Sequence, residues 1–356
     1  MSVQKIVVGM SGGVDSAVAA FLLKKDGYSV SGATLQLHDE SLNLDLLNSC
    51  CSAKEVEDAI KIAKHLEISH TVLNFKESFS KNVIDDFIRT YLEGGTPNPC
   101  VACNRYVKFE RLLTYANELG VDRIATGHYA RIQKDSSGRY LLLKGADANK
   151  DQSYVLYALS QEQLSRTVFP LGNHTKSEVR EIATECGFIN AEKKDSQDIC
   201  FVPDGDYAAF IEREIGKKYP TGDFIDLEGR LLGRHSGMIR YTIGQRKGLG
   251  IALGKPAFVV AKDAENNTVT LGDNEDLFRN ELTARRINLI ACDRIEAPTR
   301  VTAKVRYKQA EQPATVVQTG ENSITVTFDE PQRAIAKGQS VVLYDGDVVI
   351  GGGIID

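Results

Sequence analysis

The segment from Lys5 to Tyr28 constrains the fold more than any other stretch of this chain. It begins with a short apolar run, Lys-Ile-Val-Val-Gly-Met, of the kind that forms a buried parallel strand. A loop from Ser11 to Ser16 follows, and then an Ala- and Leu-rich helical segment that ends at Gly27. Gly12 and Gly13 have no Cβ, so backbone N–H groups can approach an anion at the positive end of the helix. This strand, loop and helix predict an α/β domain that binds phosphate.

Asp15 distinguishes this loop from one that binds phosphate through backbone N–H groups alone. Its carboxylate would repel a phosphate unless it held a divalent cation, such as Mg²⁺, that contacts the phosphate in turn. The loop has neither the Gly-Lys-Ser/Thr of a Walker A motif nor the Gly-x-Gly-x-x-Gly of a dinucleotide site. Ser-Gly-Gly-Val-Asp-Ser after a strand resembles the PP-loop of the ATP pyrophosphatase superfamily, whose members split ATP into AMP and pyrophosphate. The alternative is a glycine-rich turn without a ligand.

The order of the predicted elements indicates three domains in the 356 residues. Residues 1–203 alternate strands with amphipathic helices, which predicts an α/β domain with a doubly wound parallel sheet, as in adenine nucleotide α-hydrolase-like proteins. Residues 204–280 are Gly-rich and mixed, and residues 281–356 consist of short β-runs that predict a small antiparallel barrel. The sequence has no long apolar segment and no signal-peptide pattern, so we expect a cytoplasmic protein without a membrane partner.

Two residues are expected to lie over the phosphate loop. In an open parallel sheet, ligands bind at the carboxyl ends of the strands. The predicted strand Ser29–Leu37 places Leu35 at that edge, where it would contact an adenine. The predicted strand Arg123–Ala130 places Gly127 there, where the nucleotide could lie against it. For Leu35 alone, the alternative is an ordinary core residue.

The cysteines point to chemistry. Seven cysteines in a chain of this kind favour catalysis or metal binding over a disulfide framework. A Gly- and Pro-rich loop, residues 94–99, delivers Cys100 and Cys103 to the start of a predicted helix, where a thiol pKa is lowered. Cys200 lies in a polar segment next to Lys193 and Lys194, which would stabilise a thiolate. A zinc half-site is the alternative for Cys-x-x-Cys, but no second pair with zinc-finger spacing exists.

A basic stretch inside an acidic chain is a candidate RNA contact. The formal net charge is −5, yet residues 231–262 contain no Asp or Glu. The stretch carries several cations, which are Arg234, His235 if protonated, Arg240, Arg246, Lys247, Lys255 and Lys262. Such a stretch predicts a site for phosphate groups, and the alternative is a solvated surface without a ligand.

Seven motifs taken together resemble the tRNA-specific 2-thiouridylases. Besides the PP-loop, these are Thr96-Pro-Asn-Pro leading to Cys103-Asn, Ala125-Thr-Gly-His-Tyr, Lys150-Asp-Gln-Ser-Tyr, Asp195-Ser leading to Ile199-Cys-Phe, Gly244-Gln-Arg-Lys-Gly-Leu-Gly and Gly351-Gly-Gly-Ile-Ile. The resemblance extends from Ile6 to Ile355. Members of this family replace the 2-oxygen of the wobble uridine in the tRNA anticodon stem-loop with sulfur, using ATP and a persulfide from a donor or relay protein.

The resemblance implies roles for individual residues. Cys103 would be the nucleophile and Cys200 the persulfide carrier, and the two would form an alternate disulfide. ATP would be bound by Gly9, Met10, Ser11, Gly12, Gly13, Val14, Asp15, Ser16, Leu35 and Gly127. The target base would be bordered by Asn98, Pro99 and Cys100. The positions that would contact tRNA are His128, Lys150, Asp151, Gln152, Arg306, Tyr307 and Gln339.

The resemblance also implies a mechanism. Adenylation of the uridine 2-oxygen makes AMP the leaving group, and the PP-loop with a cation would stabilise the departing pyrophosphate. Cys200 would then deliver its terminal sulfur to the 2-carbon, while Cys103 attacks the persulfide. Many relatives carry Asp where this chain has Cys100. The extra thiol, with Cys50 and Cys51, resembles variants suspected of holding a 4Fe–4S cluster on Cys100, Cys103 and Cys200.

Two other functions remain open at this level. The first is another PP-loop ATP pyrophosphatase, either tRNA-modifying or amide-forming, which would not need a persulfide on Cys200. The second is a non-catalytic RNA-binding protein that carries a cluster, which would not convert ATP to AMP.

Overall fold

The computed structural model describes residues 3–37, 53–193 and 199–356. Cys50, Cys51 and the segment Lys194–Asp198, on which some of the predictions fall, lie outside the described residues. Within the described ranges no helix is long and apolar enough to cross a membrane.

A parallel sheet forms the centre of the N-terminal region. Among the described residues it has five strands in the order β3-β2-β1-β4-β7. Their bounds are β1 Lys5–Gly9, β2 Ser29–Gln36, β3 Ser69–Asn74, β4 Ile124–Thr126 and β7 Thr167–Val168. Gly9, the last residue of β1, pairs with Ala33 of β2 on one side and Thr126 of β4 on the other. The carboxyl ends of the three central strands therefore meet at one edge, as the sequence predicts.

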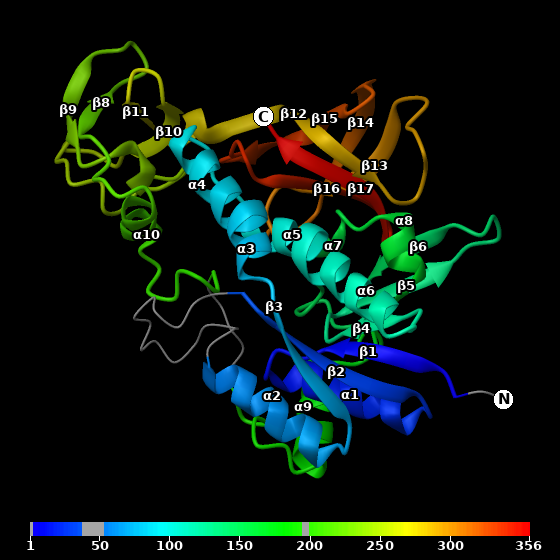
Figure 1. Cartoon of the computed structure of the whole chain (residues 1–356). Helices are drawn as coiled ribbons and strands as arrows, with labels where there is room; N and C mark the ends of the chain where they lie inside the picture. The colour runs from blue at the N-terminus through cyan, green and yellow to red at the C-terminus, as the bar shows by residue number, and fades with distance from the viewer. Residues whose placement is uncertain (1–2, 38–52, 194–198) are drawn as a thin grey trace.

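Helices cover both faces of this sheet (Figure 1). Ile6 and Val8 of β1 pack in one core cluster with residues of α1 (Val14–Lys25), α2 (Ala53–His65) and α9 (Lys176–Glu185). Val7 points the other way and packs with Phe109 and Leu112 of α6 (Phe109–Glu118). Strand residues that are buried on both faces explain the continuous apolar run of β1. The predicted doubly wound α/β fold is confirmed.

Two long helical segments pack against each other, and α6 at the end of the second covers the second face of the sheet. The first comprises α3 (Lys76–Phe79), a π-helical turn at Ser80–Ile84 and α4 (Asp85–Leu92). The second comprises α5 (Pro99–Cys103), a π-helical turn at Asn104–Lys108 and α6. The sequence predicts that this second helix begins at Asn104, whereas it begins at Pro99, because proline is well accommodated in the first helical turn. Cys103 therefore lies inside the helix, about one turn from its start.

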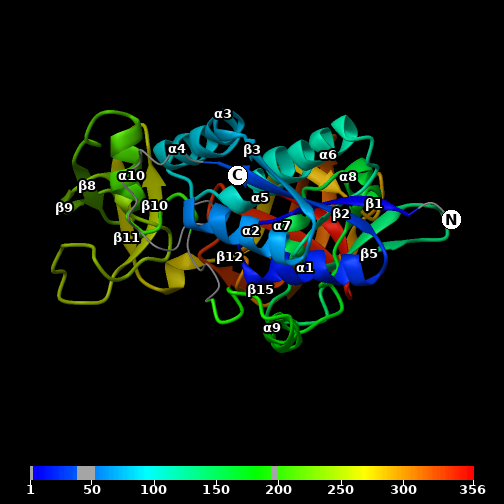
Figure 2. The ribbon, with the colours of Figure 1, turned by 60° about the horizontal axis from the view of Figure 1, so that its bottom comes forward.

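The middle of the chain forms a small mixed sheet that lies to one side of the molecule (Figures 1 and 2). In the described chain its strands follow the order β10-β11-β8-β9, with the β11–β8 pair parallel and the other pairs antiparallel. The bounds are α10 Tyr207–Glu214, β8 Gly222–Ile225, β9 Leu231–His235, β10 Phe258–Asp263 and β11 Thr268–Gly272.

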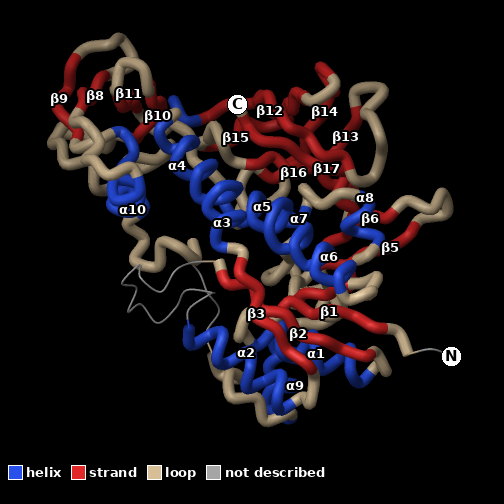
Figure 3. The backbone as a smooth tube through the Cα atoms, in the orientation of Figure 1, coloured by secondary structure: helices blue, strands red, loops and turns tan. Residues whose placement is uncertain are grey.

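The C-terminal region is a closed antiparallel barrel (Figure 3). In the described residues six strands form it, β12 Phe278–Leu289, β13 Thr299–Lys304, β14 Gln312–Gly320, β15 Ser323–Arg333, β16 Ser340–Asp345 and β17 Val348–Ile355. Pairing of β12 with both β15 and β17 closes it. The barrel that the sequence predicts is confirmed.

A hairpin from the N-terminal region joins the barrel sheet. Strands β5 (Ala130–Lys134) and β6 (Tyr140–Lys144) pair with each other, and Leu143 of β6 pairs with Val348 of β17. Two short helices follow, α7 (Ser153–Leu156) and α8 (Gln161–Ser165). Tyr154 and Tyr157 of this segment pack with Val342 and Tyr344 of the barrel in the cluster that also contains Val7. The parallel sheet and the barrel thus share one core. The predicted boundaries at 203 and 280 remain predictions.

Candidate functional site

The loop between β1 and α1 is held by hydrogen bonds to its own side chains and to β2. The Thr34 hydroxyl donates to the Met10 carbonyl at 2.7 Å. The Ser16 hydroxyl accepts from the backbone N–H of Ser11 at 3.1 Å and donates to the carbonyl of Gly13 at 3.0 Å. Hydrogen bonds within the protein therefore engage the carbonyls of Met10 and Gly13.

Two glycines in this region have no room for a side chain. Gly12 has φ +73°, and a Cβ there would lie 2.2 Å from the carbonyl oxygen of Glu55. A Cβ on Gly127 would lie 2.7 Å from the carbonyl carbon of Asp15 and 2.8 Å from the nitrogen of Ser16. Gly127 therefore packs directly against the first turn of α1, beside the phosphate loop. Its contact with a nucleotide stays a prediction.

Asp15 has two partners that the sequence does not reveal. The ammonium of Lys176, at the start of α9, contacts both carboxylate oxygens of Asp15 at 2.7 and 2.8 Å. The Tyr129 hydroxyl donates to Oδ1 at 2.8 Å. The side chain of Lys176 is 10% exposed. This positive charge lies where the sequence predicts a cation, next to the loop, and no local motif around residue 176 points to it.

Asn190 is a second residue that the sequence analysis missed. Its side-chain amide donates to the carbonyl of Gly12 at 2.9 Å, and the residue is 3% exposed. Its Oδ1 has no hydrogen-bond partner in the described part of the chain. A buried amide oxygen without a donor is costly, so this atom is a candidate acceptor for a ligand of the loop.

Lys193 has two acidic partners in the structure, and its effect on Cys200 stays a prediction. The sequence predicts that it stabilises a thiolate on Cys200, but its ammonium lies 3.2 Å from Glu55 and 3.3 Å from Asp58 of α2. Two carboxylates therefore already offset its charge. A nearby lysine in the sequence does not show where a five-atom side chain will point.

Cys103 and Cys200, which are 97 positions apart in the sequence, share one apolar cluster, and their direct approach stays a prediction. Cys103 is buried, and Cys200 is partly buried and packs against the same apolar cluster. The cluster also contains Leu37, which directly follows β2, and Leu35 packs against it. The structure thus places both predicted sulfur-handling residues near the carboxyl end of β2.

The three residues predicted to border the target base lie at the start of α5. Asn98 precedes the helix, Pro99 begins it, and Cys100 is exposed. The phenol of Tyr154 interacts with the side chain of Asn98. Burial, followed by the charges of Asp151 and Cys100, raises the pKa of Tyr307 to about 12. Tyr307, from the barrel, therefore faces the same place as Cys100.

Several predicted tRNA contacts also have internal partners. The Asp151 carboxylate accepts from the N–H of Gly145 at 3.0 Å and the hydroxyl of Ser153 at 2.8 Å. The Gln152 side chain accepts from the N–H of Tyr129 at 2.9 Å. The backbone of Lys150 donates to the carbonyl of residue 147 at 3.0 Å. These residues shape the turn before α7, and their contacts with tRNA stay predictions.

His128, Arg306 and Gln339 are likewise held by the protein. The His128 ring packs near Phe109 and Phe169, its Nδ1 lies 2.7 Å from the Thr126 hydroxyl, and burial, with a smaller effect of Lys108, lowers its pKa to about 3. Arg306 donates to the carbonyl of residue 334 at 2.7 Å, and burial lowers its pKa. Gln339 donates to the carbonyls of residues 96 and 97.

Several cations of the basic stretch 231–262 form ion pairs with acidic residues from outside the stretch, which its sequence does not predict. Arg234 pairs with Asp223 at 3.1 Å, Arg240 with Glu212 at 2.9 Å and Lys255 with Asp273 at 2.8 Å. Acidic residues outside the stretch thus neutralise much of it. Arg246 and Lys247 are exposed, and no carboxylate of the described residues is placed against them. They are the remaining candidates for phosphate contacts.

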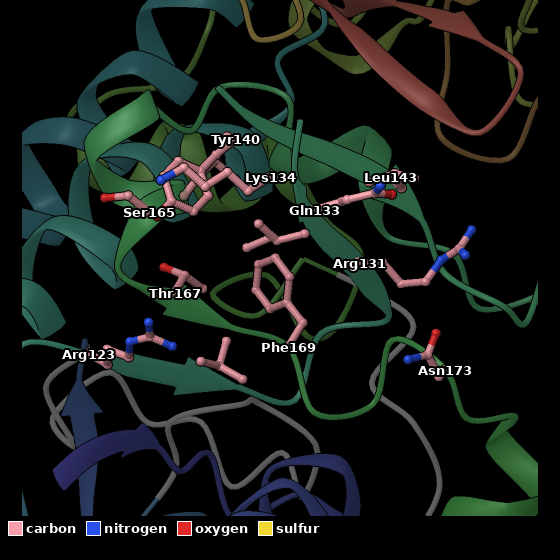
Figure 4. Close-up of a pocket in the computed structure, with 13 residues that line it drawn as sticks. Arg123, Arg131, Gln133, Lys134, Tyr140, Leu143, Ser165, Thr167, Phe169 and Asn173 are labelled. Atoms are coloured by element: carbon pink, nitrogen blue, oxygen red, sulfur yellow. The ribbon is translucent and has the colours of Figure 1, made fainter. Parts of the chain in front are cut away.

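Neither a metal centre of the described residues nor the cavity beside β7 coincides with the predicted site. Within the described ranges, no group of three or more His, Cys, Asp or Glu side chains could hold a metal, so Cys100, Cys103 and Cys200 are not arranged as a cluster site. A cavity of about 430 Å³ lies between β7 and the β5–β6 hairpin, lined by residues that include Arg123, Lys134 and Phe169 (Figure 4). No predicted site residue lines it.

The fold and the loop define the class of protein. A glycine-rich strand-to-helix loop with an internal Asp, at the carboxyl edge of a doubly wound parallel sheet, is the site of a PP-loop protein that uses ATP. Three family models match the chain in order: the tRNA methyl transferase HUP domain at residues 4–204, the tRNA methyl transferase PRC-barrel domain at 208–273 and the Aminomethyltransferase beta-barrel domain at 279–355.

Curated relatives identify the family. The tRNA-specific 2-thiouridylase MnmA of Clostridioides difficile is 53% identical over 354 residues, covering 99% of this chain and 98% of the relative. That of Acetivibrio thermocellus is 53% identical and covers 100% of both chains. Among solved structures, a 4-thiouridine synthetase in complex with RNA and ATP matches 60% of this chain and 50% of its own, with 19% identity and a TM-score of 0.38. The chain belongs to the tRNA-specific 2-thiouridylase family.

Proposed function

We propose that this chain replaces the 2-oxygen of the wobble uridine in tRNA with sulfur, at the cost of ATP cleaved to AMP and pyrophosphate. The observation that carries the proposal is the shared cluster of Cys103 and Cys200 beside the carboxyl end of β2. A PP-loop enzyme that forms amides or transfers only AMP has no need for two cysteines at this place. Because the substrate is tRNA, we expect the protein to act in the cytoplasm.

The adenylation step rests on the loop between β1 and α1. The N–H groups at the start of α1 would bind the phosphates of ATP, and Leu35 would contact the adenine. Asp15 has the oxygen donors that Mg²⁺ requires, and Mg²⁺ would stabilise the charge of the departing pyrophosphate. The Lys176 ammonium contacts both oxygens of Asp15. When Mg²⁺ binds, this ammonium must therefore share or release the carboxylate. A released Lys176 ammonium would be close enough to the loop to contact a phosphate.

The sulfur step uses Cys103, which is buried, and Cys200, which is partly buried. The terminal sulfur of a persulfide on Cys200 attacks the adenylated 2-carbon, a carbon–sulfur bond forms, and AMP leaves with the electron pair of the carbon–oxygen bond. Cys103 then attacks the inner sulfur of Cys200, and the transferred sulfur leaves with its electron pair as the thiocarbonyl of the base. The protein ends with a Cys103–Cys200 disulfide, which a thiol reductant must reduce before a donor protein loads the next sulfur.

An iron–sulfur cluster does not fit the described cysteines. The three thiols Cys100, Cys103 and Cys200 do not form a group that could hold a metal. The proposed mechanism therefore has no step through a cluster, and Cys100 needs no thiol. Cys100→Asp should retain sulfur transfer, because an Asp at this place would still border the base. Thiolation that strictly requires added iron in anaerobic protein would overturn this part of the proposal.

Mass spectrometry of tRNA nucleosides tests the proposed function. Purified protein is incubated with unmodified tRNA, ATP and a persulfide donor, and the tRNA is digested. We expect 2-thiouridine with the intact protein and none with Cys200→Ala, whereas Cys292→Ala, a cysteine that packs against the barrel core, should be active. A different modified nucleoside, or equal product with Cys200→Ala, would contradict the proposal.

A further inference from the structure

The loop that leads to the target-base residues lies between the barrel and the middle sheet. It runs from Gly94 to Asn98, after α4, and leads into α5, which ends with Cys103. On the barrel side, the backbone N–H of Thr96 donates to the carbonyl of Lys337 at 2.7 Å. The Gln339 side chain donates to the carbonyls of Thr96 at 3.0 Å and Pro97 at 3.1 Å. The barrel therefore holds the second half of this loop.

The middle sheet holds the first half through one lysine. The ammonium of Lys262, on β10, donates to the carbonyl of Gly95 at 3.2 Å and to the carbonyl of Tyr241 at 3.0 Å. It also lies 5.9 Å from the centre of the Tyr91 ring on α4. Burial lowers the pKa of Lys262 to about 8. The sequence predicts that Lys262 contacts phosphate; instead it points into the junction between the middle sheet and the loop.

Close packing leaves this loop little freedom. A Cβ on Gly95 would lie 2.7 Å from the Thr90 methyl and 3.1 Å from the Lys337 carbonyl. A Cβ on Gly338 would lie 2.6 Å from the same methyl. The backbone of the loop is thus fitted against the barrel, and Lys262 closes the opposite side. Few side chains other than lysine are long enough to reach two carbonyls from a strand and donate to both.

We propose that Lys262 is a positioning residue for sulfur transfer, and that it fixes the loop so that the target base and Cys103 meet in reactive geometry. The inference rests on the proposed role of Cys103. A displacement of about 1 Å in a catalytic group can cost on the order of 100-fold in rate, so a single tie to a carbonyl of the loop is sufficient to matter. The contacts of Lys262 are with Gly95, Tyr241 and Tyr91, so the middle sheet acts on the chemistry through the position of the loop.

The test compares Lys262→Met with Lys255→Met as a matched control. Lys255 lies in the same region, is exposed and pairs with Asp273, away from the loop. Single-turnover thiolation is measured at saturating ATP and over a range of tRNA concentrations, and hydrogen–deuterium exchange is followed in residues 93–103 and in β10–β11. We expect Lys262→Met to lower the maximal rate by about 100-fold, to leave the half-saturating tRNA concentration within about twofold, and to raise exchange in residues 93–103 alone.

Each other result counts against the inference. If the maximal rate and the hydrogen–deuterium exchange were unchanged, the hydrogen bond from Lys262 to the loop would be dispensable. A higher half-saturating tRNA concentration at constant maximal rate would make Lys262 a tRNA contact. Faster exchange in β10–β11 as well would indicate a purely structural role. If Lys262→Met does not fold, Lys262→Gln, which keeps a neutral donor, is measured in the same way. Failure of the unsubstituted protein to make 2-thiouridine would refute the proposed function instead.

Discussion

Asp15 and Lys176 are the residues on which nucleotide chemistry depends most directly. The sequence predicts the carboxylate from the motif, but the lysine lies 161 positions away, and only the packing of α9 against α1 brings the two together. The same holds for Asn190, whose amide reaches the loop from beyond α9. Residues that define a motif can be predicted from sequence, whereas their partners from distant segments cannot.

Replacing Asp15 by Ala should abolish adenylation. The variant loses the carboxylate that would bind Mg²⁺ and removes the acidic partner of the nearly buried Lys176 ammonium. We expect pyrophosphate release to fall by at least about 100-fold, which corresponds to about 2.7 kcal/mol in the barrier. Asp26→Ala, at the exposed end of the same helix, is the control and should release pyrophosphate normally. Normal release by Asp15→Ala would refute the assignment of this loop.

His128 should make the protein less stable in mild acid. Its folded pKa of about 3 lies below the ordinary value of 6.5, so between these values the unfolded chain binds a proton that the folded chain does not. The stabilisation is complete above pH 6.5 and is lost as the pH falls toward 3. At pH 5.5 the loss is about 1.4 kcal/mol relative to pH 7.5.

Urea unfolding at both pH values measures this effect. The difference in unfolding free energy between pH 7.5 and 5.5 should shrink by about that amount in His128→Gln. It should remain in His174→Gln, whose ring is partly exposed beside Glu178. An identical pH dependence for His128→Gln and the unsubstituted protein would show that His128 titrates normally in the folded state.

At the scale of elements, the sequence predicts the positions of strands and helices well. It does not predict which basic side chains form ion pairs. Hydrophobic periodicity and glycine positions locate β1, α1 and β2, because these patterns follow from local backbone geometry. The start of α5 at Pro99 rather than Asn104 is a boundary that depends on how the loop packs against the barrel. The basic stretch 231–262 is the larger difference, since its ion-pair partners lie before and after it in the chain.

The exposed pair Arg246 and Lys247 should carry the salt dependence of tRNA binding in this region. Each phosphate contact contributes about 0.9 or less to the slope of log affinity against log salt concentration. Changing both residues to Gln should therefore flatten the slope by between about 1 and 2. The double change of Arg234 and Lys255 to Gln removes cations that are already paired and should alter the slope by much less. Equal effects of the two double variants would show that the ion pairs open when tRNA binds.

At the scale of the whole molecule, the loop 94–98 of the N-terminal region contacts both the middle sheet, through Lys262, and the barrel, through Lys337 and Gln339. The sequence predicts three domains in order, and it does not predict that the β5–β6 hairpin extends the barrel sheet or that Tyr154 packs with Tyr344 in a shared core. The residues in these contacts are 205 positions apart for Leu143 and Val348 and 190 for Tyr154 and Tyr344, and no local pattern encodes them. The site is therefore a property of the assembled chain.

The most direct measurement follows one sulfur atom from Cys200 to tRNA. Protein loaded with labelled persulfide is mixed with ATP and unmodified tRNA, without free sulfur donor or reductant, and both products are analysed by mass spectrometry. If Cys200 delivers the sulfur and Cys103 resolves the persulfide, we expect up to one labelled 2-thiouridine per loaded protein, together with a peptide pair joined by a Cys103–Cys200 disulfide. Label that stays on the protein while AMP and pyrophosphate form, or labelled 2-thiouridine in the Cys103→Ser variant at the full rate, would contradict it.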